Sequence, residues 1–232
     1  MINNLRILCV VPARGGSKSI PRKNLQKVAG LSLVGRAGLV ASQIPIIDRS
    51  IVSTDDTEIA IEGQKHGLEC PFIRPESLSG DFATSLDMWK HAWLSAEQTY
   101  NEQYDISLLL EPTSPMREVA DVLRTLNKVI TGSCSAITVS RTPSHFTPEK
   151  TLCIKNEKLE YYLGDRGRNF HIRQNIPHYY HRNGICYALT RKHLIDDNSI
   201  FENADPIVIE RPIVNIDEYY ELDLANILLS DK

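Results

Sequence analysis

The chain has 232 residues, of which 42% are hydrophobic and 24% charged, and a formal net charge of -3, an ordinary composition for one globular α/β domain. The charge argues against nonspecific nucleic-acid binding, and no apolar run has the ~20 residues of a membrane span or the pattern of a secretory leader. Five scattered cysteines without a CxxC pair argue against a disulfide framework and indicate reduced thiols in a cytoplasmic protein. Three of them stand in apolar runs and are expected in the core: Cys9, Cys134 and Cys186.

An apolar run at residues 7–11 predicts a buried first strand, and the chain turns at Pro12 into a basic loop. Two glycines in this loop let the backbone approach a ligand, and successive N–H groups can cradle an anion. Residues 1–47 carry seven cations and no acidic side chain. A solvated basic loop would explain this, but loops after the first strand of α/β proteins usually carry function, so we expect a small polyanion as ligand. The cations of the loop are Arg14, Lys18, Arg22 and Lys23.

Strand and helix patterns alternate up to residue 140. This alternation predicts a largely parallel sheet covered by helices on both faces, with ligands outside the carboxyl ends of the strands. Arg14, Asp55 and Glu111 each follow a strand and are therefore expected on one rim. Apolar runs predict strands at 50–54, 68–73, 105–110 and 135–140. Helical spacing of apolar residues predicts helices at 31–44, 55–66, 86–96 and 115–130.

Two of these helices begin with recognisable capping residues. Asp55 with Glu58 three residues later forms a capping-box pattern, and local capping explains Asp55 and Asp56 without any role in ligand binding. Ser114 is expected to cap the helix at 115–130, with Pro115 in its first position because proline needs no N–H partner there.

The pattern changes at residues 141–182, which are rich in His, Pro, Arg and Tyr. A hairpin is expected between 151–154 and 159–163. We interpret the whole segment as an excursion from the sheet, either a lid or an oligomer contact. Histidines in its later part could suggest a metal site, but a solvated or interface role is favoured. The chain then returns to strands at 185–190 and 206–210 and ends in a helix at 219–229.

The opening loop does not fit the common phosphate-binding motifs. A P-loop, a dinucleotide-binding GxGxxG and a GxSxG nucleophile elbow are all absent. What remains is a phosphate-rich ligand held by cations and backbone amides. Asp217, at a later strand end, could bind Mg²⁺, which typically uses one or two carboxylates plus substrate phosphates. This combination suits attack on a nucleotide phosphate with departure of pyrophosphate.

Residues 10–24 resemble the signature of the acylneuraminate cytidylyltransferases (CMP-sialic acid synthetases), and further similar segments follow in the same order over nearly the whole chain. These segments are 52–55, 74–75, 110–115, 182–187 and 215–217. The resemblance implies a single nucleotidyltransferase domain over 1–232, with a Rossmann-like, three-layer nucleotide-diphospho-sugar transferase fold. It also implies that a nonulosonic acid such as sialic, legionaminic or pseudaminic acid reacts with CTP to give the CMP-sugar and pyrophosphate, with Mg²⁺ as cofactor.

The resemblance further implies roles for individual residues. Around the CTP phosphates these are Arg14, Ser17, Lys18, Lys23 and Asn24, and facing the cytosine they are Arg74, Ala83 and Ser85. Thr113 would lie near the ribose or the sugar, Asn183 and Tyr187 would help to hold the sugar, and Arg173 would pair with the sugar carboxylate. Glu111 is also expected among the substrate-binding residues. The metal positions are Asn215 and Asp217, and the residues expected to be catalytic are Arg14, Lys18, Lys23 and Asp217. The excursion at 141–182 would be a dimerisation segment that reaches the partner's sugar site, so a homodimer is expected.

Two positions depart from the family pattern. Glu111 stands where the family usually has Gln, and Asn215 replaces the first carboxylate of an Asp-Ile-Asp metal motif. Either Glu111 supplies the missing charge, or the first ligand is neutral and one metal binds weakly. These departures leave two alternatives. One is a nucleotidyltransferase of the same fold for another nucleotide or sugar acid, and the other is a CTP-binding homologue without catalysis.

Overall fold

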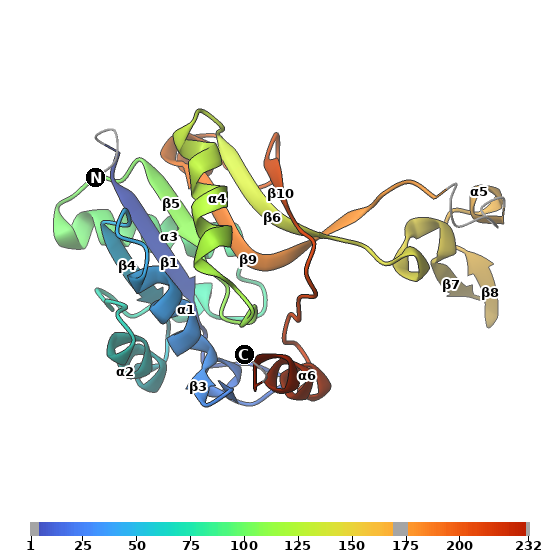
Figure 1. Cartoon of the computed structure of the whole chain (residues 1–232), viewed down its shortest axis with the longest axis horizontal. Coiled ribbons are helices and arrows are strands. Elements are labelled where there is room, and N and C mark those ends of the chain that lie inside the picture. Colours follow the sequence, from blue (N-terminus) through green and yellow to red (C-terminus); the bar gives the residue numbers. More distant parts are fainter. Residues whose placement is uncertain (1–4, 169–175, 231–232) are drawn as a thin grey trace.

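The computed structural model describes residues 5–168 and 176–230, and its centre is a six-stranded sheet in the order β10-β6-β9-β5-β1-β4 (Figure 1). All neighbouring pairs are parallel except those of β9, which is antiparallel to β5 and β6. The largely parallel sheet that the sequence predicts is therefore confirmed. The strands are β1 Ile7–Pro12, β4 Arg49–Ser53, β5 Ile106–Leu109, β6 Ser135–Arg141, β9 Tyr180–Thr190 and β10 Asp205–Ile209.

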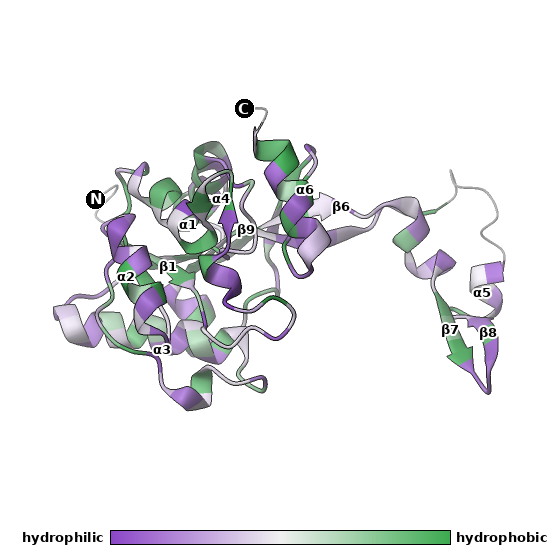
Figure 2. Ribbon diagram, turned by 90° about the horizontal axis from the view of Figure 1, so that it is seen from below, coloured by the Kyte–Doolittle hydropathy of each residue, from purple (hydrophilic) through white to green (hydrophobic). Residues whose placement is uncertain are grey.

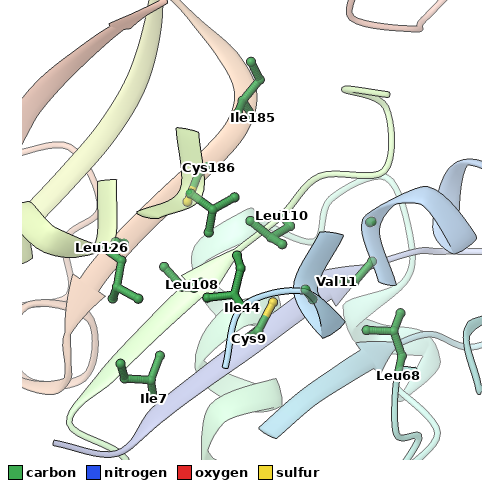
Figure 3. Packing of buried hydrophobic residues seen from close by; sticks show 14 of the residues in the cluster. Ile7, Cys9, Val11, Ile44, Leu68, Leu108, Leu110, Leu126, Ile185 and Cys186 are labelled. Carbon is green, nitrogen blue, oxygen red and sulfur yellow. The ribbon is translucent and has the colours of Figure 1, made fainter. Parts of the chain in front are cut away.

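Helices cover both faces of this sheet, and the side chains of β1 alternate between the two apolar layers. Ile7, Cys9 and Val11 face the layer under α1, α2 and α4, part of which Figure 3 shows, whereas Leu8 and Val10 face the layer under α3. This three-layer arrangement confirms the predicted α/β class. Within the described residues, none of the helices has the length and hydrophobicity needed to cross a bilayer. The helices are α1 Leu33–Ser42, α2 Thr57–Lys65, α3 Ser85–Tyr100 and α4 Val119–Ile130.

A third, smaller apolar cluster fastens the end of the chain to its beginning. Helix α6 (Tyr219–Ser230) buries Ala225 against Val28, which lies in the small β2 (Lys27–Val28) and β3 (Leu31–Ser32) ribbon. Leu222 and Leu229 pack on the same cluster, as the helical spacing predicts. This packing brings residues 213–217 beside the opening loop, where Ser19 donates a hydrogen bond to the Asp217 carbonyl.

Three local predictions are wrong. Residues 68–73 form only an isolated bridge between Ile51 and Glu69, because Pro71 has no N–H to continue a strand ladder. The helix predicted at 115–130 begins at Val119, after a capping box of Glu118 and Asp121. Ser114 does not cap it, because its hydroxyl donates to the Asn183 carbonyl instead.

Of the three cysteines expected in the core, Cys9 and Cys186 are buried but Cys134 is exposed. Cys134 lies in the turn before β6, so the buried part of that apolar run begins one residue later, at Ser135. The expectation for Cys134 is therefore wrong.

An arm projects from the body on the outer ends of β6 and β9 (Figure 1). It carries the hairpin of β7 (Leu152–Lys155) and β8 (Lys158–Tyr161), and the short helix α5 (Asp165–Arg168). The predicted hairpin is confirmed, with a tighter turn in which Asn156 and Glu157 both have positive φ, as a type I′ turn requires. The apolar side chains of β7 and β8 point to solvent, with Ile154 75% and Leu159 69% exposed, and Figure 2 shows β7 as a hydrophobic strand.

Candidate active site

A cleft of about 470 Å³ opens at the carboxyl ends of β1, β4 and β5. It lies where ligands bind in open α/β sheets. Arg14 and Glu111 line this cleft, and Gly15 of the same loop contacts Asp55, so the predicted common rim is confirmed. Most of the residues expected to bind the nucleotide, the sugar or the metal lie together in its wall: Arg14, Ser17, Lys23, Asn24, Arg74, Ala83, Ser85, Glu111, Thr113, Asn215 and Asp217.

The opening loop folds back onto the start of α2. The Gly15 N–H donates to the Asp55 carboxylate at 2.9 Å, and a Cβ at Gly15 would lie 2.8 Å from Oδ2 of Asp56. Only glycine fits there without displacing Asp56. The capping interpretation is correct for Asp56, which accepts from the N–H groups of Glu58 and Ile59, but wrong for Asp55, which binds the loop instead.

Every cation of the opening loop meets a carboxylate that comes from a distant part of the sequence. Arg22 pairs with Asp56 at 3.0 Å and with Glu58 at 3.2 Å. Lys23, only 9% exposed, donates to Asp217 at 2.8 Å and to the Ile216 carbonyl at 3.0 Å. Both Arg14 and Lys18 contact the same carboxylate, that of Asp81. The loop is therefore basic in its own sequence, but in the folded protein carboxylates from other parts of the chain pair with its cations.

Arg74 lines the cleft, and one buried nitrogen of its guanidinium has no hydrogen-bond partner among the described residues. This nitrogen is Nε, whereas Nη2 donates to the Ser53 carbonyl at 2.6 Å. Burial lowers the pKa of this guanidinium, and the nearby Asp55 carboxylate opposes that shift. Ala83 and Ser85 flank Thr84, the N-cap of α3, so small side chains form the wall near Arg74.

Glu111 follows β5 and lines the cleft. Burial raises the pKa of its carboxyl, and the guanidinium groups of Arg117 and Arg182 oppose this. Tyr187 donates a hydrogen bond to Glu111 from below, and it is itself buried rather than part of the cleft wall. The Asp217 carboxylate is close enough to raise the pKa of Glu111 further, so both groups act on the same region of the cleft.

Arg117 is a structural residue of this region that the sequence analysis did not identify. Its buried guanidinium donates to the backbone carbonyls of Glu111 at 2.6 Å, Gly184 at 3.1 Å and Ile185 at 2.5 Å. It therefore joins the end of β5 to β9. The only signal in the sequence was a charged side chain inside a segment predicted to be helical and apolar.

Gly184→Ala is expected to destabilise the protein by about 2–4 kcal/mol, because the new Cβ would clash with Oε2 of Glu111 and lie 2.5 Å from Oγ of Ser114. The positive φ of 68° adds backbone strain. Urea unfolding measures the effect. Gly30→Ala is the control, since Gly30 has a φ of 80° with open space around it and should report the backbone cost alone. Equal losses in both variants would contradict the steric part of the prediction.

A second cavity of about 830 Å³ adjoins the cleft, because Asn215 lines both. Asn183 lies in its wall and donates to Oγ of Ser140 at 3.0 Å, while the Arg182 guanidinium stacks 4.5 Å from the Phe201 ring centroid. The residues expected to bind nucleotide and sugar thus divide between two neighbouring cavities. Lys18 is exposed at the rim beside Asp81, and Arg173 lies outside the described residues.

The fit of the cleft to Mg²⁺ depends on Asp217. Its side chain is 71% exposed, and Lys23 engages one of its two carboxylate oxygens. Among residues 5–168 and 176–230, no group of three or more His, Cys, Asp or Glu side chains could hold a metal. One carboxylate plus the neutral Asn215 oxygen nevertheless fits Mg²⁺, which takes much of its coordination from substrate phosphates and water.

Comparisons with known proteins agree with this geometry. A family model described as cytidylyltransferase matches residues 8–226. A pseudaminic acid cytidylyltransferase of Campylobacter jejuni is 30% identical over 226 residues, which is 97% of this chain and 96% of that protein. A CMP-N,N'-diacetyllegionaminic acid synthase of Legionella pneumophila is 30% identical over 95% of this chain and 94% of its own.

Solved structures support the same fold. A CMP:2-keto-3-deoxy-manno-octonic acid synthetase in complex with CTP has a TM-score of 0.69 at 17% identity, over 97% of this chain and 99% of that chain. A 4-diphosphocytidyl-2C-methyl-D-erythritol synthase from Anaerococcus prevotii has a TM-score of 0.66 at 14% identity, over 99% and 98%. These similarities confirm the predicted fold over nearly the whole chain.

Proposed function

The chain belongs to the cytidylyltransferase family, and from this membership we propose that it activates a nonulosonic acid with CTP, releasing the CMP-sugar and pyrophosphate. The observation that carries this proposal is the cation-lined cleft at the carboxyl edge of the sheet, in a chain whose relatives are named for CMP transfer to pseudaminic and legionaminic acids. Five unpaired cysteines support a reducing compartment, the cytoplasm, as its location.

In this proposal the cleft binds CTP. Arg14, Lys18 and Lys23 would contact the phosphates, with Ser17 and Asn24 beside them. The unpartnered Nε of Arg74 supports a cytosine site, because a buried donor needs an acceptor and a cytosine carbonyl would supply one. The small side chains at Ala83 and Ser85 leave room for a pyrimidine.

The second cavity would hold the sugar, with Asn183 in its wall, Tyr187 and Glu111 beneath the junction, and Thr113 near the ribose. Arg173 would pair with the sugar carboxylate. We also propose a homodimer, since the apolar side chains that the arm exposes need a surface to cover them, and a second copy would provide it beside its own sugar site.

The reaction would be an in-line displacement at the α-phosphorus of CTP. The C2 hydroxyl oxygen of the sugar forms the new P–O bond, the bond to the bridging oxygen of the β-phosphate breaks, and the hydroxyl proton leaves to water. Arg14, Lys18 and Lys23 would stabilise the charge of the departing pyrophosphate. Asp217, with Asn215 beside it, would hold Mg²⁺, which when bound neutralises charge on the phosphates. Positioning and charge stabilisation would supply the catalysis.

Asp217→Asn is expected to raise the Mg²⁺ concentration for half-maximal activity by about 10-fold or more, because it removes the charged metal ligand. Electron paramagnetic resonance of added Mn²⁺ in the presence of CTP measures metal affinity independently of turnover. Asp223→Asn, an exposed acid on α6, is the control. Asn215→Asp should shift the Mg²⁺ requirement in the opposite direction, and Glu111→Gln should raise it only if Glu111 compensates for Asn215. Unchanged Mn²⁺ affinity in Asp217→Asn would contradict the assignment.

One assay tests the function itself. Pyrophosphate release is measured with Mg²⁺, each nucleoside triphosphate in turn, and a panel of sialic, legionaminic and pseudaminic acids. Release with CTP alone supports the proposal, and the sugar with the highest kcat/KM identifies the substrate. Release with a different nucleotide would favour a nucleotidyltransferase of the same fold with another specificity. Binding of CTP without turnover of any sugar would favour the inactive homologue that the Asn215 substitution suggests.

A further inference from the structure

The loop at residues 79–84 contacts the opening loop through the Asp81 carboxylate and through the backbone carbonyls of Ser79 and Gly80. The two carboxylate oxygens of Asp81 lie on different cations, with Oδ1 3.5 Å from Arg14 and Oδ2 2.5 Å from Lys18. Arg14 also donates to the Gly80 carbonyl at 3.2 Å. The hydrogen bond from Lys18 and the charges of both cations lower the pKa of Asp81, so its carboxylate is ionised at neutral pH.

Arg14 and Lys18 cannot give the same donors to Asp81 and to a nucleotide. A carboxylate bridging two cations presents two oxygens and a negative charge, as the non-bridging oxygens of a phosphate do. Asp81 also lines the cleft, so triphosphate oxygens that approach Arg14 meet its charge. Asp81 and the triphosphate would therefore compete for Nη1 of Arg14 and for the Lys18 ammonium group.

We propose that Asp81 is a built-in counter-ion that holds Arg14 and Lys18 while the cleft is free of nucleotide. The triphosphate displaces it, and the loop at residues 79–84 then moves away from the cations. Asp81 thereby weakens nucleotide binding and determines how much affinity the phosphates contribute. The inference rests on the proposed function in that a nucleoside triphosphate enters this cleft.

The loop is built in a way that allows this displacement. Its ends are fixed, since Oγ of Ser79 donates to the Pro75 carbonyl and Thr84 caps α3. Between them, Asp81 is exposed and the Phe82 ring is 100% exposed, so no apolar packing holds the tip of the loop against the body. Exposed ion pairs contribute little stability, and an incoming triphosphate carries more charge than one carboxylate.

A purely structural ion pair makes the opposite prediction. If Asp81 served only to order the opening loop, its removal would leave nucleotide affinity unchanged or weaken it. If Asp81 competes with phosphate, its removal strengthens binding. The sign of the change in affinity therefore separates the two roles.

The experiment is isothermal titration of the full chain with CTP and, separately, with pyrophosphate, at one fixed salt concentration. Asp81→Asn is expected to lower both dissociation constants by about 3- to 10-fold, the range that one or two exposed ion pairs provide. Glu76→Gln is the matched control, because it removes one exposed negative charge just before the same loop and should leave both constants within about 2-fold. The emission of a Phe82→Trp variant, after subtraction of the wild-type signal, is expected to shift on addition of CTP.

The outcomes distinguish this inference from the function on which it rests. Wild-type protein that binds neither CTP nor pyrophosphate contradicts the proposed function. Wild-type protein that binds CTP, together with an Asp81→Asn variant that binds it equally or more weakly, overturns the counter-ion role. An equal gain in Glu76→Gln also overturns it, since the effect would then come from net charge. An unchanged emission of the Phe82→Trp variant at saturating CTP overturns the movement of the loop.

Discussion

Lys23→Met is expected to lower kcat/KM for CTP, measured by pyrophosphate release, by about 100- to 1,000-fold. This loss is typical of removing one preorganised charge that stabilises the transition state. The Lys23 ammonium group is almost buried and is aimed by the Ile216 carbonyl and the Asp217 carboxylate. Methionine keeps the length and volume of the side chain but removes the charge. The Asp217 carboxylate would then face the nucleotide phosphates without a cation between them.

Steady-state release of pyrophosphate at saturating sugar and Mg²⁺ measures this loss. Lys27→Met is the matched control, because Lys27 belongs to the same segment but is exposed and does not line the cleft. Its kcat/KM should stay within about 2-fold of wild type. A Lys23→Met variant that folds normally and keeps more than a tenth of the activity would show that Lys23 orders Asp217 rather than stabilising the reacting phosphates.

Arg117→Met is expected to lower the free energy of unfolding by about 3 kcal/mol or more. The substitution removes the guanidinium donor from three backbone carbonyls, those of Glu111, Gly184 and Ile185, of which the Glu111 carbonyl still accepts from the Ser114 N–H at 3.1 Å. An unsatisfied buried acceptor costs about 1–3 kcal/mol, and some of these carbonyls regain water or a new partner. The Glu111 carboxyl would also lose the nearby positive charge that opposes the burial effect on its pKa.

Urea unfolding followed by far-ultraviolet circular dichroism measures the stability of Arg117→Met. Arg124→Met is the control, because Arg124 lies on the exposed side of α4 and, among the described residues, donates only to the Val208 carbonyl at 3.0 Å. Arg124→Met should lower the free energy of unfolding by less than about 1 kcal/mol. If Arg117→Met cost no more than Arg124→Met, the junction of β5 and β9 would be held by packing rather than by the guanidinium.

Much of the fold follows from local patterns along the chain. The alternation of strands and helices, the burial of residues 7–11 and the hairpin of the arm are all predictable, because periodicity and turn residues reflect local backbone geometry. The error at 68–73 has a local cause, because Pro71 lacks the N–H that a strand ladder needs. The error at Ser114 has a tertiary cause, because its hydroxyl binds the Asn183 carbonyl, and at Cys134 the strand begins one residue after the cysteine.

The location of the candidate site was predictable from the sequence, but the pairing of its cations with carboxylates was not. The predicted ends of the strands placed Arg14, Asp55 and Glu111 on a common rim. Similarity to the family motifs identified most of the other residues that line the cleft. Neither approach identified Arg117 or Asp81, because one binds only backbone carbonyls and the other stands in a polar loop without any pattern.

The sequence by itself determined a basic, glycine-containing loop after the first strand, and with it the prediction that the cleft binds phosphates. Within residues 1–47 no acidic side chain accompanies these cations. Only the tertiary structure decided which carboxylates meet them, since Asp81 and Asp217 arrive from loops that are distant in sequence, Asp217 lying 194 residues after Lys23. The physical reason is that an ion pair depends on separation in space, and the path of the chain through the sheet sets that separation.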